Sequence, residues 1–131
     1  MSVRIDHISC WTEDLDRLCA FYVKFFQAIV NPPYHNPIKG HTTRFLDFPG
    51  GGRFEVMHHP DIHRQISNPG EPRIGFIHLS FSVGSRENVN KLTELIRKDG
   101  YPVIDGPRLT GDGYYESSIL DPDGNRIEIT V

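Results

Sequence analysis

Four residues that could bind a divalent metal ion recur at matched places in the two halves of this 131-residue chain. His7 and His78 each open a His-apolar-Ser motif, and the two motifs lie 71 positions apart. Glu55 and Glu128 each stand in an Arg-apolar-Glu-apolar motif, and these lie 73 positions apart. Because the two offsets agree to within a short loop, they predict a duplicated supersecondary unit, each copy needing the other to bury its open face.

Two imidazoles and two carboxylates supply nitrogen and oxygen ligands whose charge balances a divalent cation such as Zn²⁺, Ni²⁺, Co²⁺, Mn²⁺ or Fe²⁺. Six-coordination would leave two positions for water or substrate oxygens. A lone histidine or glutamate on a strand is usually an ordinary surface residue. The joint recurrence of His7, Glu55, His78 and Glu128 is therefore what predicts a metal centre.

Each of these residues is expected on the polar face of a β-strand. Residues 75–83 alternate with period two, which places His78 opposite the apolar residues, and residues 3–11 do the same around His7. Glu55 in the strand 53–58 likewise alternates with apolar neighbours. All four side chains should consequently lie on the face of a sheet that does not pack on helices.

The elements that must position these residues repeat in the same order. In the first half we expect a strand over 3–11, a helix capped by Thr12 or Asp14 and ending before residue 31, an irregular loop over 31–41, and strands 42–48 and 53–58. In the second half we expect a strand over 75–83, a helix between Ser85 and Gly100 with a stripe of Val89, Leu92, Leu95 and Ile96, a short strand 101–104, a loop 105–113, and strands 114–120 and 125–131. The polar stretch 59–73 is expected to link module 1 (about 1–66) to module 2 (about 74–131) in one domain spanning 1–131.

Composition limits the classes of function. The chain is 37% hydrophobic and 24% charged with a net charge of -3, typical of a globular protein without affinity for nucleic acid or an anionic membrane. No apolar run approaches the roughly 18 residues that span a bilayer. Cys10 and Cys19 lack metal-type spacing and suggest reduced thiols, hence a cytoplasmic protein.

A second histidine cluster competes with the proposed centre. His58, His59 and His63 follow the strand of Glu55, and His59 and His63 could share a face if Pro60 began a helical turn. This cluster has no counterpart in the second half. We interpret it as mostly a solvated loop, with lining of a pocket mouth as the alternative.

The chain resembles the vicinal oxygen chelate superfamily, the glyoxalase I/bleomycin resistance/dioxygenase group. The segments that carry the resemblance span the whole chain, and the last, 121–129, is the most specific: Asp6-His7-Ile8, residues 20–26, Phe54-Glu55-Val56, residues 77–83, and Asp-Pro-Asp-Gly-Asn-Arg-Ile-Glu-Ile over 121–129. The resemblance implies an α+β fold in which two βαβββ modules form a curved, half-open mixed β-barrel. By position it implies a glyoxalase I-like ligand set of His7, Glu55, His78 and Glu128, holding Zn or Ni in preference to Co, Mn or Fe.

Glyoxalase I-like chemistry would make the protein a metal-dependent lyase or isomerase acting on a small substrate with two adjacent oxygens. The metal would acidify the neighbouring C–H and stabilise an enediolate. Glu128 is the preferred general base, and Glu55 could return the proton. A homodimer is expected, with the ligands coming from one chain or from two.

Trp11 and His59 occupy positions where glutathione-using bacterial relatives carry Arg and Asn, so a glutathione grip is not predicted. Other classes within the superfamily remain open. One is a non-enzymatic drug- or metabolite-binding module of the bleomycin-resistance type. The others are an acyl-CoA epimerase and an Fe²⁺ dioxygenase, although a four-residue ligand set differs from the three residues that extradiol dioxygenases use.

Overall fold

A computed structural model describes residues 1–64, 68 and 71–131 of the chain. The chain divides into two compact units, Met1–Gln65 and Ile66–Val131. Residues 65–67, 69 and 70 of the predicted linker 59–73 lie outside the described residues. Neither helix within the described ranges has the length and apolar character needed to cross a membrane.

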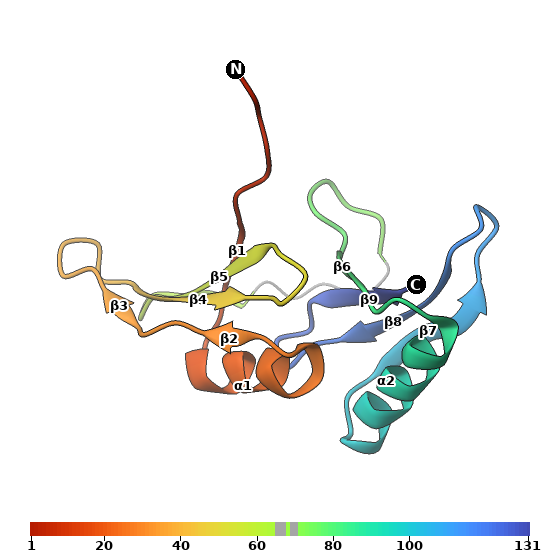
Figure 1. Ribbon diagram of the computed structural model, residues 1–131. Coiled ribbons are helices and arrows are strands. Elements are labelled where there is room, and N and C mark those ends of the chain that lie inside the picture. Colours follow the sequence, from red (N-terminus) through yellow and green to blue (C-terminus); the bar gives the residue numbers. More distant parts are fainter. Residues whose placement is uncertain (65–67, 69–70) are drawn as a thin grey trace. The chain divides into compact units, whose positions relative to one another are not determined.

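The first unit is a five-stranded mixed sheet with one helix against it (Figure 1). Its elements are β1 (Ile8–Trp11), α1 (Leu15–Phe26), β2 (Ile29–Val30), β3 (Tyr34–His35), β4 (Thr42–Asp47) and β5 (Arg53–His58). The strand order is β1-β5-β4-β2, with β3 pairing with β4. β1 runs parallel to β5, whereas β4 and β5 are antiparallel.

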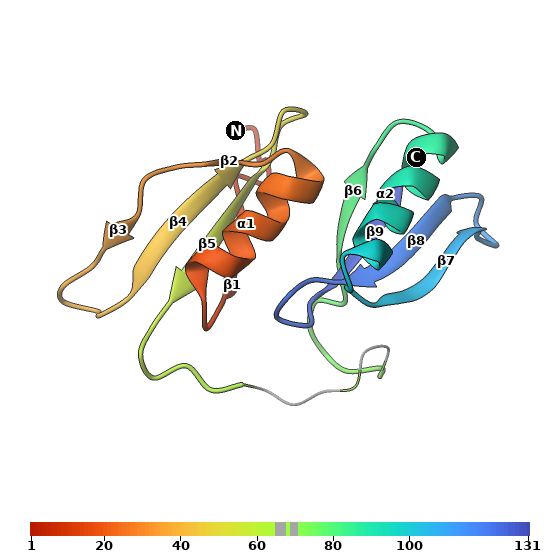
Figure 2. The same ribbon diagram turned by 90° about the horizontal axis from the view of Figure 1, so that it is seen from below.

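The second unit repeats this plan with four strands. Its elements are β6 (Leu79–Ser82), α2 (Arg86–Lys98), β7 (Val103–Leu109), β8 (Tyr115–Leu120) and β9 (Arg126–Thr130). The order β6-β9-β8-β7 matches β1-β5-β4-β2, and β6 is parallel to β9 as β1 is to β5. Figure 2 shows each helix lying along one face of its own sheet. The predicted duplication of a βαβββ module and the α+β class are confirmed.

Both helices begin where the sequence predicts. The side chain of Asp14 accepts a hydrogen bond from the backbone N–H of Arg17, and Ser85 does the same for Asn88, so each satisfies an N–H that the first helical turn leaves open. α1 ends at Gln27, which adopts a left-handed conformation with φ of 58°. The first helix therefore ends before residue 31, as expected.

The buried stripe of α2 differs from the prediction, because Leu92 is only half-buried and Leu95 is exposed. Leu95 is 48% exposed, whereas Thr93 is fully buried together with Val89 and Ile96. The hydroxyl of Thr93 is satisfied inside the core, because it donates to the carbonyl of Val89 at 2.6 Å and contacts the hydroxyl of Ser117 on β8 at 2.6 Å. A satisfied hydroxyl can replace a leucine at this position of the stripe.

The predicted strands 3–11 and 75–83 are too long at their beginnings. β1 starts at Ile8 and β6 at Leu79, so His7 and His78 each directly precede a strand instead of lying within one. The reason is the length of the partner strand. β5 begins at Arg53 and β9 at Arg126, one residue before the partners of Ile8 and Leu79, so the segments before residues 7 and 78 extend past the start of the strand with which they could pair.

Two predicted loops contain strand. Within the expected loop 31–41, β3 pairs with Thr42 and Thr43, and the side chain of Asn36 accepts the backbone N–H groups of Ile38 and Lys39 to form the turn between them. Strand β7 runs through the expected loop 105–113 as far as Leu109, despite Gly106 and the cis peptide bond that precedes Pro107. A sheet tolerates proline at an edge, and β7 is an edge strand with two register shifts.

Candidate metal centre

In the first unit, the parallel pairing of β1 and β5 brings His7 to Glu55. Ser9 pairs with Glu55, and His7 precedes Ser9 by two residues. Phe54 of β5 packs on Tyr22 of α1 at 5.2 Å between ring centroids, so Glu55 points away from the helix. We call this side of each sheet the open face. There the Nε2 of His7 lies 3.5 Å from the Oε2 of Glu55.

Asp6 orients the His7 ring. Its Oδ2 lies 2.9 Å from the Nδ1 of His7, which leaves Nε2 as the nitrogen that faces Glu55. The hydrogen bond to His7 lowers the pKa of Asp6, so the carboxylate is held ionised. A carboxylate on the second ring nitrogen is the usual support of a metal-binding histidine. The sequence analysis used Asp6 only as part of the family motif, although its place next to His7 was a signal for this role.

In the second unit, β6 and β9 repeat the arrangement. Ser80 pairs with Glu128, and His78 precedes Ser80 by two residues. The Nε2 of His78 lies 3.1 Å from the Oε2 of Glu128. The glutamates are more buried than the histidines. The exposed fraction of the side chain is 18% for Glu55 and 12% for Glu128, compared with 38% for His7 and 36% for His78.

The turn before β9 places Glu128 through its own hydrogen bonds. The buried carboxylate of Asp121 accepts the backbone N–H groups of Asp123 and Asn125, each at 2.9 Å, and also the side-chain amide of Asn125. This is a turn in which an aspartate bonds to the backbone that follows it. It explains why the Asp-Pro-Asp-Gly-Asn segment directly precedes the strand of Glu128.

The structure thus brings the four predicted residues together as two pairs, one in each unit. Among the described residues, no group of three or more His, Cys, Asp or Glu side chains is close enough to hold a metal ion. Each pair offers one imidazole nitrogen and one carboxylate oxygen, and two such pairs have the donor chemistry of a divalent-ion site. The donor chemistry of the two pairs therefore fits a divalent metal ion.

The open faces of the two units differ around their pairs. Opposite Glu55, β4 carries Phe45, whose ring meets the His7 ring edge-on at 5.5 Å between centroids. Opposite Glu128, β8 carries Ser118. An aromatic ring therefore packs against the His7–Glu55 pair, whereas a polar side chain lies beside the His78–Glu128 pair.

Glu116 is a further acidic residue that the sequence analysis did not select. It lies on β8 two residues from Ser118 and therefore on the same face as Glu128. Partial burial raises the pKa of the Glu116 carboxyl, and the neighbouring Glu128 and Asp112 carboxylates raise it further. The alternation of residues 114–120 was the signal that could have found it.

The competing histidine cluster has structural roles in the described chain. His58 bonds through Nδ1 to the carbonyl of Thr12 at 3.0 Å. His59 accepts the backbone N–H of Asp61 on Nδ1, and its Nε2 lies 3.0 Å from the carbonyl of Lys39. Residues 60 and 61 form a turn and not the helical turn that would align His59 with His63. Both ring nitrogens of His59 are thus used to tie loops together.

The model of the Glyoxalase/Bleomycin resistance protein/Dioxygenase superfamily matches residues 4–129. The uncharacterized protein YqjT of Bacillus subtilis (strain 168) is 32% identical over 75 residues, covering 55% of this chain and 53% of that protein. The chain thus spans about half the length of the curated relative that it matches.

Solved structures share the fold at low identity. A glyoxylase/bleomycin resistance protein/dioxygenase domain from Frankia sp. EAN1pec has a TM-score of 0.83 at 21% identity, covering 100% of this chain and 98% of that one. The trypanothione-dependent glyoxalase I of Leishmania major has a TM-score of 0.76 at 22% identity, covering 98% and 86%. A glyoxalase I variant from Zea mays has a TM-score of 0.77 at 24% identity, covering 97% and 44%.

These likenesses establish the fold, and the family match covers both His–Glu pairs and nearly the whole length of the chain. The superfamily contains enzymes, as the glyoxalases I among the solved structures illustrate. The chain therefore belongs to the Glyoxalase/Bleomycin resistance protein/Dioxygenase superfamily.

Proposed function

We propose that this protein is a metal-dependent lyase or isomerase of the glyoxalase I type, acting on a small substrate with two adjacent oxygens. The observation that carries the proposal is the repeated His–Glu pair, with Nε2 to Oε2 distances of 3.5 Å in one unit and 3.1 Å in the other. The pairs would complete one centre, either within a chain or between the chains of a homodimer.

His7, Glu55, His78 and Glu128 would hold the ion, with Zn²⁺ or Ni²⁺ preferred. When bound, the ion would polarise the two substrate oxygens and increase the acidity of the adjacent C–H. Asp6 supports this role, since it orients the His7 ring. The two carboxylates would then act as the proton-transfer groups.

Glu128 would remove the proton from the carbon next to the polarised carbonyl. Glu55 would deliver a proton to the neighbouring carbon, and the proton held by Glu128 would then pass to Glu55, so that both groups return to their starting state and the reaction is a net isomerisation. Both carboxylates are less exposed than the paired histidines, which limits exchange of the proton with water. These are the roles of a matched acid–base pair.

The test combines metal analysis with an assay on the hemithioacetal of methylglyoxal and glutathione. We expect bound divalent metal, and a loss of turnover of about 10²-fold or more in Glu128→Gln, because the amide cannot accept the proton. Glu87→Gln is the control, since Glu87 only pairs with Lys91 on the surface of α2. Full activity in Glu128→Gln would exclude Glu128 as the base. Bound metal without turnover would point to another substrate of the same class.

A binding module for drugs or metabolites is the second candidate function. The observation in its favour is Trp11, which is 53% exposed and meets the rings of His41 and His59 edge-on at 6.4 and 6.5 Å. An exposed tryptophan framed by two histidines can stack on a planar ligand. Protein that neither contains nor takes up a divalent ion would favour this function over the enzyme.

A further inference from the structure

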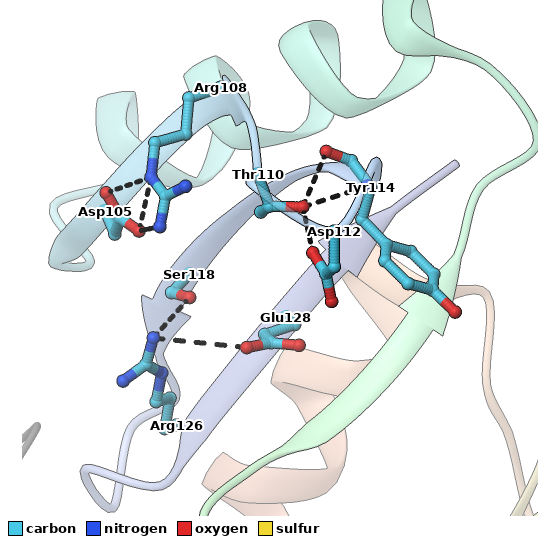
Figure 3. Close-up of polar contacts among 8 residues, drawn as sticks. All are labelled: Asp105, Arg108, Thr110, Asp112, Tyr114, Ser118, Arg126 and Glu128. Atoms are coloured by element: carbon cyan, nitrogen blue, oxygen red, sulfur yellow. Dashed lines mark hydrogen bonds and ion pairs between the residues drawn. The ribbon is translucent and has the colours of Figure 1, made fainter.

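Arg126 of the second unit has more hydrogen-bonding capacity than its surroundings use. It lies on the open face of β9, two residues before Glu128. Its Nη2 donates to the hydroxyl of Ser118 at 3.1 Å and lies 4.0 Å from the Oε1 of Glu128, as Figure 3 shows. Its Nε is buried without a hydrogen-bond partner in the described part of the chain. A guanidinium that donates so few of its N–H groups to protein atoms is available to bind an anion.

The repeat contains a natural comparison for Arg126. Arg53 holds the matching place in the Arg-apolar-Glu motif of the first unit, two residues before Glu55. It is neutralised by its cross-strand neighbour Asp47, which accepts from the Nε of Arg53 at 2.7 Å. Its guanidinium also lies over the ring of Phe45, 4.3 Å from the centroid. In the first unit, therefore, the arginine has both an aspartate partner and an aromatic ring against its guanidinium.

Both of these partners are replaced in the second unit. The cross-strand neighbour of Arg126 is Leu120, where Arg53 faces Asp47. The residue opposite Glu128 is Ser118, where Glu55 faces Phe45. The two units thus present the same arginine in two states: Arg53 is hydrogen-bonded to an aspartate at 2.7 Å, whereas Arg126 has only the longer 4.0 Å ion pair with Glu128.

The neighbouring charges do not replace the missing aspartate. The positive charge of Arg126 contributes to the lowered pKa of Asp105, so the two side chains are near each other. The Asp105 carboxylate is nevertheless bound by Arg108, whose Nε lies 2.9 and 3.0 Å from the two carboxylate oxygens and whose Nη2 lies 2.6 Å from Oδ2 (Figure 3). Glu128 makes no hydrogen bond to Arg126 at 4.0 Å, and its other oxygen faces His78. Glu116 lies opposite Arg108, its cross-strand neighbour on β7. Arg126 is therefore the guanidinium next to the His78–Glu128 pair that remains open to an external anion.

We propose that Arg126, together with the hydroxyl of Ser118, binds a carboxylate of the small molecule that occupies the site beside His78 and Glu128. The planar guanidinium matches a carboxylate in geometry and charge. The inference deepens the proposed function and rests on it for the identity of the occupant as a substrate. It specifies the substrate class as a vicinal-oxygen compound that carries an additional carboxylate.

The test uses three 2-hydroxy acids that differ only in the group on the third carbon: lactate, malate and 3-phosphoglycerate. Binding to the zinc-loaded full chain is measured by isothermal titration calorimetry. We expect malate to bind about tenfold tighter than lactate, the difference that one charge-assisted hydrogen-bonded pair provides. Arg126→Gln should abolish this ratio and leave lactate affinity and zinc content unchanged.

Two further variants make the test specific. Arg53→Gln is the matched control and should retain the malate-to-lactate ratio, because Arg53 is already neutralised by Asp47. Leu120→Asp should reduce the ratio about as much as Arg126→Gln does, because it gives Arg126 the carboxylate that Arg53 has. If Leu120→Asp fails to fold, Arg126→Lys, which keeps the charge without the planar fork, replaces it and should reduce the ratio in part.

The remaining outcomes would overturn the proposal in distinct ways. An unchanged ratio in Arg126→Gln would show that the extra carboxylate binds elsewhere. Tighter binding of 3-phosphoglycerate than of malate would assign the site to a phosphate. Loss of zinc from Arg126→Gln would make Arg126 a residue that positions Glu128 instead. Failure of the wild-type protein to bind zinc would refute the proposed function, and the malate-to-lactate ratio of the metal-free protein would still test Arg126 alone.

Discussion

At the scale of the residue, the two His–Glu pairs are alike in contact and unlike in surroundings. Each pair joins an imidazole nitrogen to a carboxylate oxygen. The first is supported by Asp6 and packed by Phe45, whereas Glu128 of the second lies among polar and charged side chains. This asymmetry favours different tasks for the two carboxylates, with Glu128 on the side where a polar substrate group can be bound.

Glu116 leads to a prediction on pH and stability. Because its pKa is raised in the folded protein, the folded state holds this proton more tightly than the unfolded state does. The metal-free protein should therefore lose stability as the pH rises from the ordinary glutamate pKa of 4.5 through the raised value. Glu116→Gln should remove this loss, so the variant should be more stable than the wild type at pH 8 and equally stable at pH 4. Urea unfolding at the two pH values measures the difference.

Glu87→Gln is the matching control for this experiment. The hydrogen bond from Lys91 lowers the pKa of Glu87, so its contribution to stability should have the opposite sign and be lost as the pH falls. Equal responses of the two variants to pH would contradict the assignment of the raised pKa to Glu116.

At the scale of the element, one buried pair of hydroxyls attaches α2 to its sheet. Thr93 donates to the carbonyl of Val89 and so must accept from Ser117, because each hydroxyl has a single proton. Thr93→Val should leave the Ser117 hydroxyl without an acceptor and cost about 1–2 kcal/mol of unfolding free energy. Thermal or urea unfolding gives this value.

A double-mutant cycle separates the hydrogen bond from general packing. Thr93→Val combined with Ser117→Ala removes both polar groups, and the pair should show a coupling of about 1 kcal/mol. Strictly additive effects of the two substitutions would mean that the hydroxyls do not depend on each other.

The turn between β8 and β9 leads to a graded prediction. Asp121→Ala removes an acceptor that serves two backbone N–H groups and one side-chain amide, and should cost about 2–3 kcal/mol. Asn125→Ala removes only the amide bond and should cost about 1 kcal/mol. Comparable losses in urea unfolding would show that the backbone bonds to Asp121 add nothing.

At the scale of the whole molecule, the division of ligands between two units predicts the metal stoichiometry. Each unit supplies only two of the four proposed ligands, so we expect one ion per chain, irrespective of whether the pairs meet within a chain or between two copies. Mass-spectrometric metal analysis should find that His7→Ala and His78→Ala each lower the content well below one ion. His63→Ala is the matched control and should retain the ion. Two ions per chain would mean that each pair binds its own.

The sequence alone determined the features that depend on local chemistry. Asp14 and Ser85 start the helices as predicted, because a capping side chain bonds to backbone only three residues away. Period-two alternation placed Phe54, Val56, Ile127 and Ile129 in the core, and these are at most 5% exposed. The sequence also predicted the duplication, because the His-apolar-Ser and Arg-apolar-Glu motifs recur at nearly equal spacing. In the structure, both copies pair the strand after the histidine in parallel with the strand of the glutamate.

Only the tertiary structure decided what depends on a distant partner. β1 and β6 are shorter than predicted because their partner strands begin within one residue of the positions opposite Ile8 and Leu79, and residues 105–109 form strand because β8 pairs with them. Thr93 replaces Leu95 in the core because Ser117 and the carbonyl of Val89 satisfy its hydroxyl. The same holds for the candidate site. Spacing identified His7, Glu55, His78 and Glu128. The difference between Arg53 and Arg126 lies in their cross-strand neighbours Asp47 and Leu120, which the register of each hairpin brings opposite them.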